Sequence, residues 1–128
     1  MSLLKIYQGR ALQAALQEIV SPVQVDYMTL DRPEPDLLAA LDDLKDLTPH
    51  LLTSVKQDST LEVDRLVVHA ENGRELIFVG APLGLELSAL VSAIVVAGRN
   101  DSGLSPETRE ALADLPAPVH LEVFTTPT

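Results

Sequence analysis

The sequence contains no cysteine among its 128 residues. Thiolate nucleophiles, disulfide bonds and cysteine-ligated metal sites all need this side chain, so these residues can form none of them. Tryptophan is also absent and aromatic residues make up 3% of the chain, so a core must be built from Leu, Val, Ile and Ala. A chain of 128 residues suits one domain that buries a sizeable core.

Positive charge is scarce as well. Nine Lys and Arg stand against 19 Asp and Glu, which gives a formal net charge of −10. Proteins that bind nucleic acids or anionic membrane surfaces need clustered cations, and because this sequence has no such cluster we expect neither partner. The acidity is most simply explained by solubility.

The sequence also lacks a long hydrophobic run. The longest, Leu83–Ala97, contains Glu86 and two serines, and it is shorter than the ~20 residues of a membrane span. The N-terminus has no apolar stretch followed by a cleavage site, so no signal peptide is expected. We therefore expect a cytoplasmic protein.

Hydrophobic periodicity predicts helices and strands in alternation. In chain order, they are a helix over Leu3–Val20, a strand over Val23–Thr29, a helix on Leu37, Leu38, Leu41 and Leu44 that ends at Thr48-Pro49, strands over Leu51–Lys56, Leu66–His69 and Leu76–Val79, a helix over Leu85–Ala97, a helix that begins after Ser105 and ends near Leu115, and a strand over Val119–Phe124. Right-handed crossovers would make the first two strands parallel.

The stretch Glu71–Gly98 forms the centre of this plan. Asn72-Gly73 predicts a hairpin with a type I′ turn, which needs positive φ at both residues. The corner Gly80–Gly84 then leads into the most apolar helix. It lacks the glycine spacing of a phosphate-binding loop, and Glu86 would repel phosphate, so a structural corner is favoured.

Two segments resemble a known family. Phe78-Val79-Gly80-Ala81-Pro82-Leu83-Gly84-Leu85-Glu86-Leu87 and the tail Val119–Thr128 are similar to the N-terminal thioredoxin-like unit of the alkyl hydroperoxide reductase flavoprotein subunit and of glutaredoxin-like protein disulfide oxidoreductases. The resemblance implies a thioredoxin-like α/β fold, with a mixed four-stranded sheet flanked by helices and a C-terminal extra strand. It divides the chain into a thioredoxin-like domain over 1–115, and a linker with the first strand of a second unit over 116–128.

The departures from this family concern its redox chemistry. In the family the strand that the tail resembles runs into a Cys-x-x-Cys motif, and the present sequence stops just before that position. The loop that can carry a cysteine pair in the first unit corresponds to Asp31, Arg32, Pro33 and Glu34. The family's cis-proline neighbourhood corresponds to Asp64. The resemblance therefore implies a non-catalytic scaffold, without a cofactor, in a disulfide-reduction or peroxide-detoxification system.

Three other groups of polar residues allow alternative functions. Asp31, Glu34 and Asp36 could hold a hard cation, but helix capping and solvation are favoured. His50, His69 and His120 lack the spacing of zinc ligands, and only His69 and His120 could meet, if their strands are neighbours. Asp42, Asp43 and Asp46 favour a solvated helix face over a partner patch.

The apolar helix over Leu85–Ala97 predicts an interface. Its outward positions Leu85, Ala89, Ala93 and Val96 are all apolar, and a helix that is apolar all round is normally buried all round. We expect the covering partner to be a second thioredoxin-like unit or another copy of the chain. Through the complete protein, the resemblance also implies a peroxiredoxin or a flavoprotein reductase as partner. The alternative function is a stand-alone, cysteine-free binding or dimerisation module.

Overall fold

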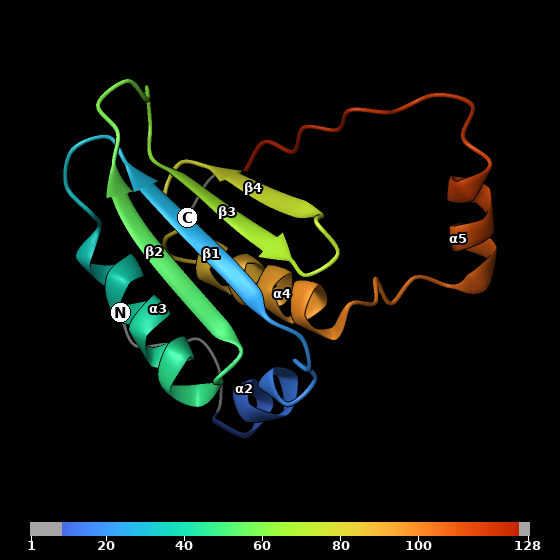
Figure 1. Cartoon of the computed structure of the whole chain (residues 1–128), viewed down its shortest axis with the longest axis horizontal. Coiled ribbons are helices and arrows are strands. Elements are labelled where there is room, and N and C mark those ends of the chain that lie inside the picture. The colour runs from blue at the N-terminus through green and yellow to red at the C-terminus, as the bar shows by residue number, and fades with distance from the viewer. Residues whose placement is uncertain (1–8, 126–128) are drawn as a thin grey trace.

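The structure, a computed structural model, describes residues 9–125. Its elements are α2 (Gly9–Leu16), β1 (Val23–Thr29), α3 (Pro35–Leu47), β2 (Leu51–Gln57), β3 (Arg65–Ala70), β4 (Glu75–Val79), α4 (Glu86–Arg99) and α5 (Pro106–Ala113). The strands form one sheet in the order β2-β1-β3-β4 (Figure 1). β1 is parallel to β2 and antiparallel to β3, and β3 is antiparallel to β4. The predicted mixed four-stranded sheet is confirmed.

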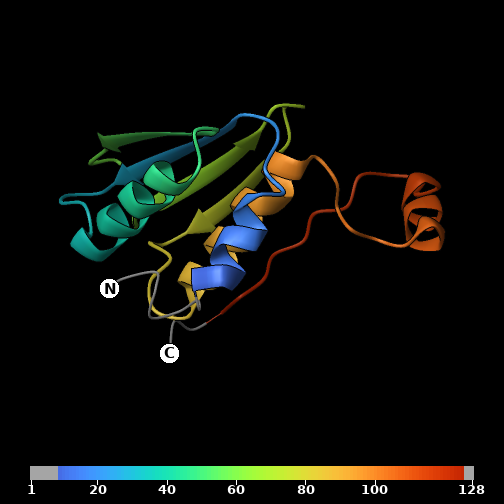
Figure 2. The ribbon, with the colours of Figure 1, turned by 90° about the horizontal axis from the view of Figure 1, so that it is seen from below.

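The helices α2, α3 and α4 all lie on one face of this sheet (Figure 2). β1 alternates between buried and half-buried residues, and its buried side chains Val23, Val25 and Tyr27 point to the helices. Leu66 and Val68 of β3 share this face. The strand predicted over Val23–Thr29 is confirmed, and its period-two alternation corresponds to one buried and one half-buried side, because alternate strand residues point to opposite faces.

The opposite face of the sheet is bare. β2 and β3 are joined by a loop over residues 58–64, and none of the described helices covers this face. Its middle row consists of Ser54, Asp26, Val67 and Ile77, which are paired across the four strands. The predicted flanking helices thus protect only one side of the sheet.

The apolar helix α4 packs on β1 and β3 and also meets α2 (Figure 2). A Cβ on Gly98 would lie 2.5 Å from Cγ2 of Ile19, so only glycine permits this close approach. The backbone N–H groups of Val20 and Ser21 both donate to the carbonyl oxygen of Gly98. The segment that follows α2 therefore covers the C-terminal end of α4.

The hairpin between β3 and β4 is confirmed, but its turn type is wrong. Gly73 has φ +86°, whereas Asn72 does not have a positive φ. The N–H of Gly73 donates to the carbonyl of Ala70, and the N–H of Ala70 donates to the carbonyl of Arg74. This is a three-residue loop, in which a type I turn is followed by one left-handed glycine, and it needs positive φ only at that glycine.

The segment after α4 forms an arm that is exposed throughout. Ser105 caps α5 by accepting the N–H of Thr108, as its Ser-Pro-Glu start predicts. The expected strand over Val119–Phe124 pairs with no strand in the structure, so the predicted C-terminal extra strand is wrong for a single copy of the chain. Of the helix expected over Leu3–Val20, residues 9–16 are helical, and residues 3–8 lie outside the described part.

Candidate functional site

The loop between β1 and α3 contains the positions that the family resemblance assigned to a redox pair. Asp31, Arg32 and Glu34 are exposed and Pro33 is half-buried. α3 begins at Pro35, which occupies the first helical position, and Asp36 lies in its first turn, where a carboxylate complements the helix dipole. The local sequence therefore accounts for the loop and the helix start without any bound group.

Asp64 ties this loop to the end of β1. One carboxylate oxygen accepts the hydroxyl of Tyr27 at 2.6 Å, and the other accepts the N–H of Leu30 at 2.9 Å and the hydroxyl of Thr29 at 3.4 Å. The Tyr27 oxygen in turn accepts the N–H of Glu34 at 3.1 Å. We call Tyr27 and Asp64, with these bonds, the Tyr27–Asp64 clamp.

The clamp suits a structural role better than a chemical one. Burial, together with the hydrogen bond to Asp64, raises the pKa of Tyr27 to about 12. The phenol therefore stays protonated at neutral pH, where it is neither a base nor a nucleophile. Every polar atom of the clamp is engaged in joining β1 to the loop, so the arrangement holds the loop in place.

The high pKa of Tyr27 predicts a stability change at alkaline pH. Because the folded-state pKa of about 12 lies above the ordinary value of 10.0, Tyr27 stabilises the fold fully below about pH 10. This contribution, on the order of 2 kcal/mol, is lost as the pH rises toward about 12. In urea unfolding, the difference in the free energy of unfolding between the wild type and Tyr27→Phe should therefore become smaller over this pH range. The other titrating groups are common to both proteins and do not change this difference. A difference that does not change with pH would contradict the role assigned to the Tyr27–Asp64 clamp.

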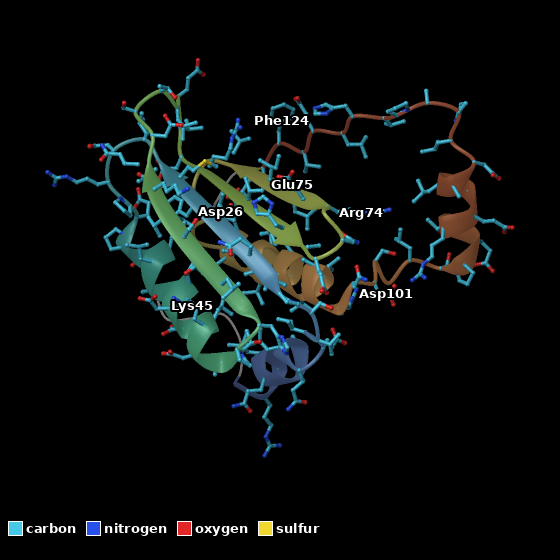
Figure 3. All side chains as sticks on the ribbon, in the orientation of Figure 1. Asp26, Lys45, Arg74, Glu75, Asp101 and Phe124 are labelled. Atoms are coloured by element: carbon cyan, nitrogen blue, oxygen red, sulfur yellow. The ribbon has the colours of Figure 1, made fainter. Side chains whose placement is uncertain are left out.

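A second polar cluster lies on the bare face of the sheet, where Asp26 and Glu75 are labelled in Figure 3. Asp26 accepts hydrogen bonds from Ser54 at 2.6 Å and from Gln24 at 2.8 Å. His69 lies between two carboxylates, 2.9 Å from Asp26 and 3.6 Å from Glu75. Burial raises the pKa of Asp26, but the bonds from Ser54, Gln24 and His69 outweigh it and leave that pKa below its ordinary value.

This cluster does not form a nucleophilic site. A serine nucleophile needs a histidine beside its hydroxyl, whereas Ser54 binds the carboxylate of Asp26 and leaves His69 on the other side. No group of three or more His, Cys, Asp or Glu within residues 9–125 is placed to hold a metal ion. The cation hypothesis for Asp31, Glu34 and Asp36 therefore gains no support.

The three histidines lie in different parts of the structure. His69 belongs to the bare-face cluster, His120 pairs with Glu122 on the exposed arm, and the N–H of His50 bonds to Thr48. The three aspartates that were assigned to a solvated face of α3 are all exposed. They are Asp42, Asp43 and Asp46.

The predicted interface residues of α4 do not lie on one exposed face. Leu85 is 68% exposed and Ala89 is exposed, but Val96 is half-buried. Ala93 is wrong as an interface residue, because it belongs to the buried core cluster at 8% exposure. The start of α4, with the N-cap residue Leu85 and with Ala89, is thus the part of the predicted interface that is exposed.

The corner before α4 depends on two glycines. Gly80 and Gly84 both have positive φ, at 93° and 58°, which glycine adopts readily. The N–H of Gly80 donates to the backbone carbonyl of Asp64 at 2.6 Å. This bond anchors the end of β4 beside the Tyr27–Asp64 clamp.

No protein-family model and no curated protein sequence matches the chain. Solved structures do match. A protein disulfide oxidoreductase from Aeropyrum pernix has a TM-score of 0.60 and 27% identity, over 83% of this chain and 53% of that one. The AhpF component of alkylhydroperoxide reductase from Enterococcus faecalis has a TM-score of 0.67 and 18% identity, over 84% and 58% of the two chains. Sso1120 from Sulfolobus solfataricus gives 0.54 and 14%, over 83% and 58%.

These similarities show that the chain has a thioredoxin-like fold, with four strands in a mixed sheet and helices beside it. They also confirm the resemblance that the segments Phe78–Leu87 and Val119–Thr128 indicated. The chain spans between 53% and 58% of the length of these three structures. Within residues 9–125, no helix is long and apolar enough to cross a bilayer.

Proposed function

We propose that the chain is a non-catalytic, thioredoxin-like scaffold that forms the N-terminal part of a cytoplasmic thiol–disulfide oxidoreductase. The observation that carries this proposal is the likeness, at 27% identity, to one half of a protein disulfide oxidoreductase by a chain without cysteine. Thiol–disulfide exchange begins with attack by a thiolate, so the reacting dithiol must belong to another unit. A peroxiredoxin or a flavoprotein reductase would be reached through that unit.

The structure supports a scaffold role for this chain, with the reacting dithiol in another unit. The positions assigned to a redox loop are held by the Tyr27–Asp64 clamp, whose phenol and carboxylate stabilise the loop in the absence of a dithiol. The scaffold would act by offering apolar surface to the redox-active unit. Burial of such surface stabilises a neighbouring domain by about 25 cal/mol per Å².

A second candidate function is a stand-alone binding or dimerisation module. It is favoured by the exposed arm, on which Leu121, Val123 and Phe124 are between 84% and 89% exposed. Large apolar side chains gathered on one extended segment mark an interaction surface. This candidate needs no redox-active unit.

An activity assay tests the first proposal. With dithiothreitol as electron donor, the chain alone should reduce insulin disulfides no faster than dithiothreitol does. Joined ahead of the second unit of the Aeropyrum pernix oxidoreductase, in place of that protein's first unit, it should give an active reductase. Reduction by the chain alone would contradict the proposal, and so would a folded but inactive chimera.

A further inference from the structure

β4 is an edge strand whose outer backbone groups can be identified. Gly80 donates its N–H to the carbonyl of Asp64, and Ala70 donates its N–H to the carbonyl of Arg74, at the two ends of the ladder with β3. Hydrogen-bonded positions alternate along an antiparallel strand, so the even-numbered residues of β4 bond to β3. The odd-numbered residues point their N–H and C=O groups outward, and these are Glu75, Ile77 and Val79.

This edge has little protection against pairing with another strand. Natural edge strands are commonly guarded by lysine, proline, a bulge or a covering loop. β4 carries one charged residue, Glu75, at its start, and it contains no proline. Its side chains Ile77 and Val79 are 56% and 71% exposed. The edge therefore offers free hydrogen-bonding groups together with apolar surface.

An apolar strip of α4 lies beside this edge, on the helix-covered side of the sheet, whereas Ile77 and Val79 point to the bare face. Leu85, the N-cap of α4, and Ala89 and Val96 within the helix share one stripe at helical spacing, with the buried Ala93 between Ala89 and Val96. At one end of the stripe, Val96 and Leu76 of β4 line the same cavity of about 240 Å³, which places the stripe on the β4 side of α4. At the other end, Leu85 and Ala89 are exposed. We call the outer edge of β4 and this strip the β4–α4 groove.

The arm carries a segment that suits such a groove. In Val119–Phe124, the apolar residues Val119, Leu121 and Val123 alternate with His120 and Glu122, which is the pattern of a half-buried strand. The segment is nevertheless unpaired and exposed, and Phe124 stands clear of the sheet (Figure 3).

Chain topology disfavours pairing of this segment with β4 of its own copy. Thr125 bonds to Glu86 at the start of α4, so the segment runs in the same direction as β4 (Figure 1). β4 is parallel to β1, because both are antiparallel to β3, and α3 and α4 lie on the same face. A strand added beyond β4 would lie at the opposite edge of the sheet from β2, so the step from β4 to this strand runs in the opposite direction across the sheet from the step from β1 to β2. The crossovers β1-α3-β2 and β4-α4-segment would then have opposite hands, yet about 98% of such crossovers are right-handed.

We propose that the β4–α4 groove is a docking site for an extended strand, and that its occupant is the Val119–Phe124 segment of a second copy of this chain. A strand from another copy is not joined to β4 by a crossover connection, so the preference for right-handed crossovers does not apply to it. Val119, Leu121 and Val123 would then cover Leu85 and Ala89, while the polar side of the segment faces water. Reciprocal exchange between two copies fills both grooves and closes the assembly as a symmetric dimer. The inference rests on the second candidate function, the dimerisation module, and names its partner and its contact surface, because the first would place the Val119–Phe124 segment in a following unit.

Sedimentation of the whole chain over a concentration series tests the inference, and a reversible monomer–dimer equilibrium is expected. Leu121→Asp, which places a charge on the apolar side of the segment, should weaken the dimer at least tenfold. Ile77→Pro should do the same, because it removes an outward N–H without breaking the ladder to β3. The matched controls His120→Ser and Ile77→Thr, which keep the apolar side and the N–H respectively, should retain the dimer.

Mixing the two dimer-defective variants gives a sharper result. Leu121→Asp keeps an intact groove and Ile77→Pro keeps an intact segment, so together they should form a heterodimer with one exchanged strand. If each variant unfolds at the same urea concentration as the wild type, at protein concentrations where the chain is monomeric, both variants are folded. A chain that stays monomeric at millimolar concentration would overturn the inference, as would a dimer that both variants leave unchanged. Neither result would affect the insulin-reduction test of the proposed function.

Discussion

Replacing Asp64 with alanine is expected to lower the free energy of unfolding by about 2–4 kcal/mol. The substitution removes the acceptor of the Tyr27 hydroxyl and of the Leu30 N–H, and it leaves the phenol of a fully buried side chain without its partner. Bonds to a carboxylate are stronger than neutral ones, and an orphaned buried donor adds its own desolvation cost. Urea unfolding followed by circular dichroism measures the loss.

The control for this experiment is Asp64→Asn. The amide keeps an oxygen that can accept the Leu30 N–H, and its nitrogen can donate to the Tyr27 oxygen, so it should lose less than half as much stability. Equal losses in the two variants would mean that charge, and not the geometry of the clamp, sustains the loop. If Asp64→Ala lowered the free energy of unfolding by less than about 0.5 kcal/mol, Asp64 would behave as an ordinary surface residue. This result would contradict the stabilising role of the Tyr27–Asp64 clamp.

The second large effect is expected at Leu90, at the centre of α4. Leu90 is fully buried between the sheet and the other helices, and truncation to alanine should cost about 2–5 kcal/mol, because it removes burial and leaves a cavity. Leu85→Ala, at the N-cap of the same helix and 68% exposed, should cost less than about 0.5 kcal/mol in the monomeric chain. Denaturant midpoints of the pair, measured at low protein concentration, check the prediction.

The comparison of these two leucines also tests how α4 is covered. If Leu85→Ala cost as much as Leu90→Ala in the monomer, the exposed strip of the β4–α4 groove would already be buried by the chain's own arm. The proposed exchange with a second copy would then lose its basis. If Leu90→Ala were tolerated, the assignment of Leu90 to the close-packed core would be wrong.

Much of the fold could be predicted from the sequence because its signals are local. Alternation in Val23–Thr29 identified β1, since strand residues two apart share a face. Ser105-Pro106 located the start of α5, since the cap and the first turn depend only on neighbouring residues. The hairpin was also predicted, but its turn type depended on the exact loop length between β3 and β4, which the dipeptide Asn72-Gly73 does not specify.

The candidate sites were harder to predict because they join distant residues. Tyr27 and Asp64 are 37 positions apart, and nothing near Tyr27 in the sequence indicates that its hydroxyl meets a carboxylate. The bare-face cluster left a weak signal, in that Asp26, Ser54 and His69 occupy polar positions on three strands, but their contact depends on register. Ala93 was assigned to an outer face because helical periodicity does not show how far neighbouring elements wrap around a helix.

The proposed scaffold role, in which this chain stabilises a redox-active unit, is tested most directly by denaturant unfolding of the Aeropyrum pernix chimera. The second unit of that oxidoreductase should unfold at a higher denaturant concentration when joined to this chain than when alone, in one cooperative transition with it. Two separate transitions, with the second unit no more stable than the isolated unit, would contradict the scaffold role.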